Sequence, residues 1–152
     1  MSNKENTVRL HHVFKAPPER VYRAFVDTDA LVRWIPPYGF IGKVHEADIR
    51  VGGSIHMSFV NFGTGNANSF RATYLELVEP SKLRYTDQFD DPSMPNRMEV
   101  TITIEPVVAG TELKVVQTNI PEQIPLSYCY LGWQESLAQL KNLVEPEIPD
   151  GA

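Results

Sequence analysis

Asp87 and Arg71 are the charged residues whose positions could bring chemistry inside this protein. They lie in two consecutive stretches of mixed polar and apolar residues, 69–78 and 83–89, joined by the turn Glu79–Ser81. A carboxylate held inside a fold can anchor the polar head of a ligand, or act as a general acid or base with a raised pKa. The spacing of the two strands therefore decides whether this pair has a chemical role.

The turn is expected to pair Leu77 with Leu83. Counting back from that pair places Arg71 opposite Phe89 on the inner face, with Asp87 as its diagonal neighbour. An ion pair near the open end of the sheet is the simpler interpretation of the two charges. A slip of one residue in register would instead turn Asp87 to solvent.

The histidines and the cysteine have the wrong spacing for a metal site. His11 and His12 are adjacent on an expected strand and so point to opposite faces, and His45 and His56 belong to no HxxxH or HExxH motif. Cys129 lies among apolar residues, where a free cysteine usually acts as a small hydrophobe. No GxSxG motif is present either. We therefore expect no metal, no cofactor and no covalent catalysis.

An apolar cavity is the second candidate site. Alternation places many apolar and aromatic side chains on one face of the strands, and further aromatic residues follow in flanking segments. A core that these side chains simply fill is the alternative interpretation. The candidate ligand-binding residues are Trp34, Tyr38, Phe40, Met57, Phe59, Arg71, Tyr85, Asp87, Phe89, Met98, Gln117, Tyr130 and Trp133.

These residues are positioned by elements that the sequence predicts in order. A strand over 7–14 precedes a helix opened by Ala16-Pro17-Pro18-Glu19, since proline and an acid suit a first turn. A short helix Ala30–Trp34 follows, and Pro36-Pro37 ends it. Strands are then expected over 39–49, 54–60, 69–78, 83–89, 98–105 and 111–118, and a long amphipathic helix over 127–145.

The apolar faces of these elements must cover each other. Met98, Val100, Ile102 and Ile104 point to one face while polar residues alternate with them, the pattern of an antiparallel sheet with one solvated face. The last helix carries an apolar stripe at spacings of three and four residues. The predicted fold is α+β: a curved antiparallel sheet of about seven strands around a long C-terminal helix, with two short helices after the first strand.

Composition places the chain among ordinary globular proteins. It has 152 residues, a net charge of −5 and one cysteine, so one domain over 1–152 is expected, with an ordered core of about 7–145. An acidic balance without a basic stripe argues against nucleic acid or an anionic membrane as partner. The single cysteine and the lack of an apolar leader or membrane span fit the cytoplasm. A monomer and a homodimer are both compatible with these features.

Three stretches carry a resemblance to a known family. They are Ala16–Phe25 with Trp34 downstream, Asp48–Gly53, and Gly132–Leu137 with its following leucines. With the element order, they resemble the START-like (SRPBCC, helix-grip) superfamily, in the branch related to the activator of the 90-kDa heat-shock protein ATPase. These motifs are mostly turn and packing residues.

The resemblance implies a helix-grip fold with space between sheet and helix, and no universal catalytic set. The expected function is non-enzymatic binding of a small apolar or amphipathic ligand. Two alternatives stay open, because fold alone does not assign function. One is an enzyme like the polyketide cyclases or aromatases, and the other is a co-chaperone or stress-response protein that stimulates a chaperone ATPase. Where many relatives have an aromatic residue, this chain has Asp87.

Overall fold

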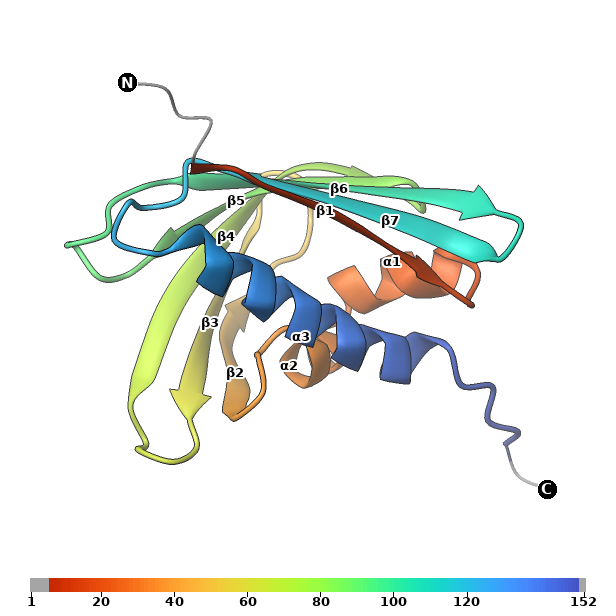
Figure 1. Ribbon diagram of the computed structural model, residues 1–152, viewed down its shortest axis with the longest axis horizontal. Helices are drawn as coiled ribbons and strands as arrows, with labels where there is room; N and C mark the ends of the chain where they lie inside the picture. The colour runs from red at the N-terminus through yellow and green to blue at the C-terminus, as the bar shows by residue number, and fades with distance from the viewer. Residues whose placement is uncertain (1–5, 151–152) are drawn as a thin grey trace.

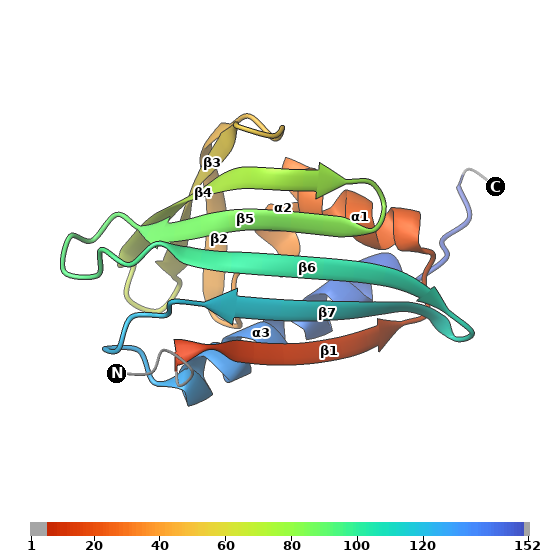
Figure 2. The ribbon, with the colours of Figure 1, turned by 90° about the horizontal axis from the view of Figure 1, so that it is seen from above.

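A curved antiparallel sheet and a long C-terminal helix that crosses its concave face define the architecture (Figure 1). The computed structural model describes residues 6–150. The seven strands lie in the order β1-β7-β6-β5-β4-β3-β2, and Figure 2 shows the central ones side by side. The strands are β1 Val8–Phe14, β2 Phe40–Ala47, β3 Ser54–Asn61, β4 Ala67–Val78, β5 Lys82–Phe89, β6 Met98–Val107 and β7 Gly110–Thr118.

Two short helices follow β1, as predicted. Helix α1 spans Pro18–Val26 and begins with proline, whose missing N–H has no partner in a first turn anyway. Helix α2 spans Thr28–Trp34, and the Asp27 side chain caps it by accepting hydrogen bonds from the backbone N–H groups of Asp29 and Ala30 at 2.9 and 3.1 Å. Both helices pack beneath the concave face and close one end of it (Figure 1).

The long helix α3 spans Leu126–Val144 and presents its predicted stripe to the sheet. Leu137, Leu140 and Val144 are buried, whereas Tyr128 and Leu131 on the opposite side are exposed. The helix-grip class and the antiparallel pairing predicted from the sequence are therefore confirmed. In the first half of α3 no residue is buried, so the two halves of the helix differ in how firmly they are packed.

The pairing of β4 with β5 corrects one sequence prediction. Leu77 pairs with Leu83 as expected, but a β-bulge follows, so that Tyr74 rather than Leu75 lies opposite Tyr85. One extra residue reverses the face of every side chain before it. Phe70, Ala72 and Tyr74 therefore point inward. The prediction that Arg71 lies on the inner face was wrong, because alternation was counted through a bulge.

Candidate functional site

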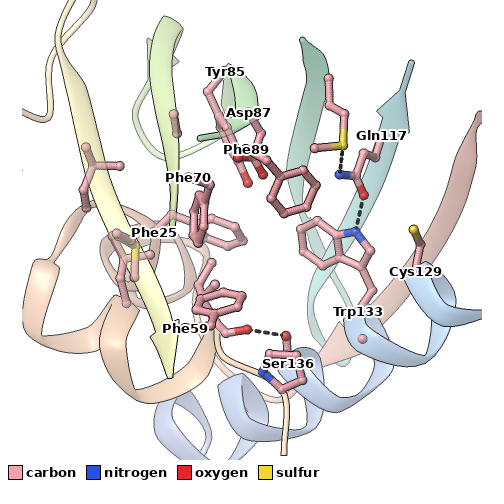
Figure 3. Close-up of a pocket in the computed structure, with 18 of the residues that line it drawn as sticks. Phe25, Phe59, Phe70, Tyr85, Asp87, Phe89, Gln117, Cys129, Trp133 and Ser136 are labelled. Atoms are coloured by element: carbon pink, nitrogen blue, oxygen red, sulfur yellow. Dashed lines mark hydrogen bonds between the residues drawn. The ribbon is translucent and has the colours of Figure 1, made fainter. Parts of the chain in front are cut away.

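An open recess lies between the concave face of the sheet and α3. Its volume is about 210 Å³, and it is partly open to solvent. Its walls come from α1, α2, the strands β3 to β7 and the first half of α3 (Figure 3). The lining residues are Phe25, Leu31, Ile35, Pro37, Ile55, Met57, Phe59, Phe70, Ala72, Tyr74, Tyr85, Asp87, Phe89, Met98, Gln117, Ile124, Cys129, Gly132, Trp133 and Ser136.

Most predicted site residues meet at this recess. Those that line it are Met57, Phe59, Tyr85, Asp87, Phe89, Met98, Gln117 and Trp133. Their strands bring them there because alternate residues of neighbouring strands share one face. A role in ligand binding stays a prediction for each of them.

Trp34 and Tyr130 have structural contacts away from the recess. Trp34 is fully buried and donates a hydrogen bond from Nε1 to the Ala24 carbonyl oxygen at 2.8 Å. The Tyr130 hydroxyl accepts a hydrogen bond from the backbone N–H of Arg9 at 3.2 Å, which joins α3 to the edge strand β1. Neither residue lines the recess.

Tyr38 and Phe40 also lie outside the lining. The Tyr38 side chain is 58% exposed, while its backbone N–H donates to Glu135 Oε1 at 3.1 Å. Phe40 lies beside the wall, since its ring centroid is 6.4 Å from that of Phe59. Both are therefore neighbours of the site.

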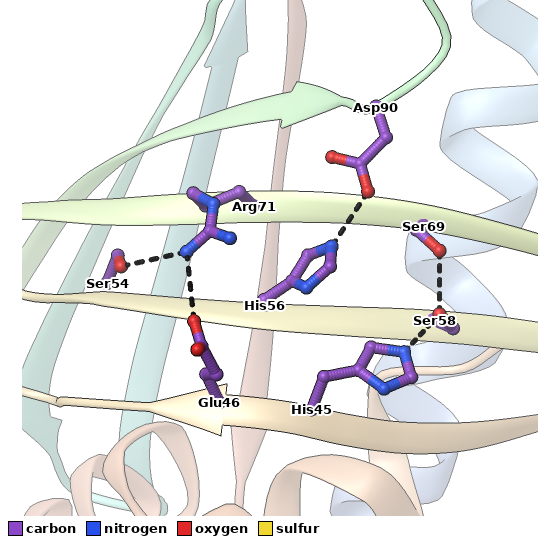
Figure 4. Close-up of polar contacts among 8 residues, drawn as sticks. All are labelled: His45, Glu46, Ser54, His56, Ser58, Ser69, Arg71 and Asp90. Atoms are coloured by element: carbon purple, nitrogen blue, oxygen red, sulfur yellow. Dashed lines mark hydrogen bonds and ion pairs between the residues drawn. The ribbon is translucent and has the colours of Figure 1, made fainter.

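Arg71 lies on the outer face of the sheet (Figure 4). Its Nη1 lies 3.7 Å from Glu46 Oε1 and donates to Ser54 Oγ at 3.4 Å. The same face carries two close polar pairs, His56–Asp90 at 2.7 Å and His45–Ser58 at 2.6 Å. The prediction that Arg71 lies close to Asp87 in the interior is therefore wrong, because the β-bulge in β4 turns Arg71 to the outer face.

Asp87 is the polar centre of the recess. It pairs with Ala72 on β4 and with Met98 on β6, so neither neighbour can donate a strong hydrogen bond. Its Oδ1 atom is buried and has no hydrogen-bond partner among residues 6–150. A buried carboxyl oxygen without a hydrogen bond lowers the stability of the fold, and such groups are usually explained by a functional role or by a bound partner.

The protonation of Asp87 follows from this environment. Removal from water raises the pKa of Asp87 from 3.8 to about 7, although a hydrogen bond from the backbone N–H of Gln88 acts in the opposite direction. By surface area the whole residue is only half-buried, because part of it faces the open recess. The Oδ1 atom itself is buried, and the charge of the ionised group is shared between the two carboxyl oxygens.

Two tyrosines extend the polar edge of the site. Tyr74 and Tyr85 pack edge to face with ring centroids 6.0 Å apart. Burial, and then the nearby Asp87 carboxyl, raise the pKa of both phenols. Both side chains therefore stay neutral over the physiological range.

Gln117 and Trp133 join the sheet to α3 across the recess. Trp133 Nε1 donates to Gln117 Oε1 at 2.8 Å, and Gln117 Nε2 points to the Met98 sulfur at 3.3 Å (Figure 3). A sulfur atom is a weak acceptor, so the amide N–H groups keep capacity for a stronger partner.

The second half of α3 is tied firmly to the loop after α2. Ser136 Oγ donates to the Ile35 carbonyl oxygen at 2.6 Å. Gln139 Nε2 donates to the carbonyl oxygens of Trp34 and Pro36 at 3.0 and 2.6 Å. These bonds anchor the second half of α3, while most of the α3 residues that line the recess, Cys129, Gly132 and Trp133, belong to its first half.

Sequence reasoning missed part of the lining. Phe70, Ala72 and Tyr74 were not among the predicted site residues, because a bulge gives no reliable signal in a single sequence. Gly132 had a signal, since a glycine inside an apolar helix face needs a reason. A Cβ atom placed on Gly132 would meet nothing within 4 Å, so this position opens directly onto free space.

Among residues 6–150, no group of three histidine, cysteine, aspartate or glutamate side chains is arranged to hold a metal ion. Over the same described range, no helix combines the length and apolar character needed to cross a bilayer.

A curved sheet gripping one long helix, with an apolar recess between them, defines a protein of the helix-grip class. The model of the family described as activator of Hsp90 ATPase homolog 1-like protein matches residues 15–145, and the chain belongs to that family. The resemblance predicted from the sequence motifs is therefore confirmed. A comparison with curated proteins found no match.

Solved structures agree with this assignment. A crystal structure of a protein from Chromobacterium violaceum is 54% identical, covers 93% of this chain and 99% of its own, and has a TM-score of 0.92. A Rhodobacter sphaeroides protein is 18% identical over 92% of each chain, with a TM-score of 0.80. A Mycobacterium smegmatis protein is also 18% identical, covers 97% of this chain and 96% of its own, and has a TM-score of 0.78. The last two share the fold alone.

Proposed function

We propose that this protein binds a small amphipathic molecule between the concave face of the sheet and the first half of α3, without changing it chemically. The observation that carries the proposal is a recess of about 210 Å³ whose walls are mainly apolar and whose one carboxyl group has an unpaired oxygen. Ligand sites in proteins combine these features: an apolar wall for affinity and a few polar groups for orientation.

The apolar walls supply the affinity. Phe59 and Phe70 pack edge to face with centroids 4.9 Å apart, and Trp133 forms part of the α3 wall. Each Å² of apolar ligand surface removed from water contributes about 25 cal/mol before the costs of association. Asp87 and the amide of Gln117 orient the polar end.

The packing of α3 supports a route into the recess. Its buried residues all lie at Ser136 or beyond, whereas Tyr128 and Leu131 in the first half are exposed. The first half is attached to the sheet by two side-chain hydrogen bonds, one at Tyr130 and one at Trp133. This half also packs against the apolar cluster of Val8, Met98 and Ile120 through side chains that are only partly buried, so an outward movement of it would separate these contacts while the second half stays in place.

Native mass spectrometry of freshly purified protein tests the proposal. We expect an additional bound mass of small-molecule size on the wild type. Gly132→Leu should abolish it, because the new side chain would extend into the recess without meeting backbone. Gln134→Leu adds the same side chain at an exposed position of α3 and should leave the bound mass unchanged. An equal mass on Gly132→Leu, with its fold intact, or no bound mass on the wild type even after incubation with apolar probes, would contradict the proposal.

One observation favours a second function. A buried carboxyl group whose pKa is near 7 can both give and take a proton at neutral pH. This supports an enzyme of the cyclase or aromatase kind in which Asp87 is the general acid or base. Asp87→Asn would then abolish turnover of a cyclisable substrate while ligand binding persists. Equal turnover by the variant would reject this role for Asp87.

Stimulation of a chaperone ATPase is the alternative that the family description suggests. It requires a partner surface instead of the recess. Addition of this protein to an Hsp90-type chaperone should then raise ATP turnover, and Gly132→Leu should stimulate as well as the wild type. An unchanged rate of ATP turnover would dismiss this alternative.

A further inference from the structure

The recess has a negative group and no positive one. Asp87 is the only acidic side chain in its lining, and no lysine, arginine or histidine from the described residues 6–150 lines it. Arg71, the cation nearest to it along β4, is held on the outer face by Glu46 and Ser54. An ionised Asp87 therefore has no counter-charge among the described residues that line the recess.

A carboxylate without a counter-charge in an apolar space must take a proton or meet a cation. Its neighbours across the strands, Ala72 and Met98, offer no donor. The buried Oδ1 atom has no hydrogen-bond partner in the part of the chain that the structure describes, so an incoming group with several N–H donors would supply the missing hydrogen bonds. An ammonium group carries both the charge and the donors.

Aromatic rings surround the same space. Aromatic rings project toward it from the three strands β3, β4 and β5 and from α3 (Figure 3): Phe59, Phe70, Tyr85, Phe89 and Trp133. Ring faces attract cations as well as other rings, and they do so more strongly when water is excluded. The walls therefore suit a ligand that combines a cationic head with an apolar or aromatic body.

The volume limits the size of that ligand. A cavity of about 150 Å³ holds benzene. A recess of about 210 Å³ therefore has room for one ring and a short chain, or for an aliphatic amine of similar bulk. A longer body would project through the open side.

From these observations we propose that the recess selects a primary or secondary amine with a small apolar body, bound as the ammonium ion against the Asp87 carboxylate. The proposal rests on the proposed ligand-binding function and names the chemical class of the ligand. A neutral alcohol or hydrocarbon of the same shape should bind more weakly, because it leaves the carboxyl group without charge compensation.

The proton balance gives a signature that packing alone would not produce. Removal of water raises the pKa of Asp87 to about 7, so the group is mostly protonated at pH 6 in the empty recess. An ammonium ion that pairs with the carboxylate displaces that proton to the buffer. The other titratable groups that line the recess are Tyr74, Tyr85 and Cys129, and burial raises the pKa of each, so they stay neutral at pH 6. Gln117 and Trp133, which line it from β7 and α3, do not titrate.

Isothermal titration calorimetry with phenethylamine, phenethyl alcohol and ethylbenzene tests the proposal. At pH 8 the wild type should bind the amine at least tenfold more tightly than the alcohol. At pH 6, in buffers of different ionisation enthalpy, amine binding should release close to one proton per ligand, and alcohol binding none. Asp87→Asn should lose the preference for the amine and the proton release while it keeps its affinity for ethylbenzene.

Glu122→Gln removes one negative charge from an exposed position and is the matched control, so it should behave as the wild type. Circular dichroism establishes that each variant is folded. Equal affinity of the wild type for all three probes would overturn the amine selectivity and leave the binding function standing. Failure of all three probes to bind would count against the binding function itself.

Discussion

At the scale of single residues, Asp87 decides the chemistry. It is surrounded by side chains that give it neither a charge nor a strong hydrogen bond, and its Oδ1 atom has no partner in the described chain. A rise of the pKa from 3.8 to about 7 corresponds to an ionisation cost of about 4 kcal/mol at most. Natural proteins keep such costs mainly where a function uses the group.

This cost predicts how stability depends on pH. The folded-state pKa of Asp87 is raised, so folding favours its protonated form. The contribution of Asp87 to folding stability is therefore fully present below about pH 4 and is lost as pH rises to about 7. Asp87→Asn should therefore gain stability relative to the wild type between pH 4 and pH 7, by up to about 4 kcal/mol, with no further change above pH 7. Urea denaturation at pH 4.5 and pH 8 measures the difference.

Asp91→Asn is the contrasting control. Hydrogen bonds from the Ser93 backbone N–H and hydroxyl lower the pKa of Asp91, so its contribution is present near neutral pH and is lost as pH falls. That loss occurs only below about pH 4, so the effect of Asp91→Asn on the free energy of unfolding should be the same at pH 4.5 and pH 8, while the effect of Asp87→Asn changes between them. An Asp87→Asn effect of the same size at both pH values would show that the carboxyl group is not desolvated.

At the scale of elements, the β-bulge in β4 determines which side chains reach the recess. Tyr74 is buried at 4% exposure, and Leu75 beside it is 36% exposed. Simple alternation predicts the reverse. Because the bulge leaves one residue unpaired, it moves Phe70 and Ala72 inward and Arg71 outward.

The register predicts unequal effects of two neighbouring substitutions. Tyr74→Ala should destabilise the protein by about 3 kcal/mol or more, since it empties a buried aromatic site. Leu75→Ala should lower stability by less than about 1 kcal/mol, because the Leu75 side chain is partly exposed and its removal leaves no buried cavity. Urea unfolding of both variants measures the contrast. A larger loss for Leu75→Ala would show that the register without a bulge is correct.

Helix α3 carries a glycine where its own stability would favour another residue. Alanine is better than glycine inside a helix by about 1 kcal/mol. A Cβ atom at Gly132 would meet nothing within 4 Å, so no clash offsets that gain. Gly132→Ala should therefore raise the free energy of unfolding by about 0.5 to 1 kcal/mol. A loss of stability would indicate that the free space at this position is closed in solution.

At the scale of the whole molecule, the sequence predicts the fold better than it predicts the residues of the candidate site. Alternation in 98–105 and 111–118 and the stripe of the last helix specify which faces must be covered, and hydrophobic burial then enforces the grip. The proline and glycine punctuation likewise places the turns near 52, 80 and 110. These signals depend on burial and backbone sterics, which a single sequence records directly.

The candidate site could be predicted only in part, for physical reasons. Met57, Tyr85 and Gln117 were placed correctly on the inner face because alternation runs unbroken along their own strands, the extra residues of the nearby register shifts lying in β2 and β4. Arg71 was not, because a bulge of one residue changes the face without changing composition. Trp34 was expected near the site by residue type, yet its hydrogen bond to Ala24 and its contact with Phe25 keep it in the core.

The most direct test of the central claim is a crystal structure of the protein soaked with ethylbenzene and, in a separate crystal, with phenethylamine. We predict electron density for each probe in the recess beneath residues 126–137 of α3, with the amine nitrogen within hydrogen-bond distance of the Asp87 carboxyl group. Density for neither probe, with Phe59, Phe70 and Trp133 moved together to fill the space, would contradict the account.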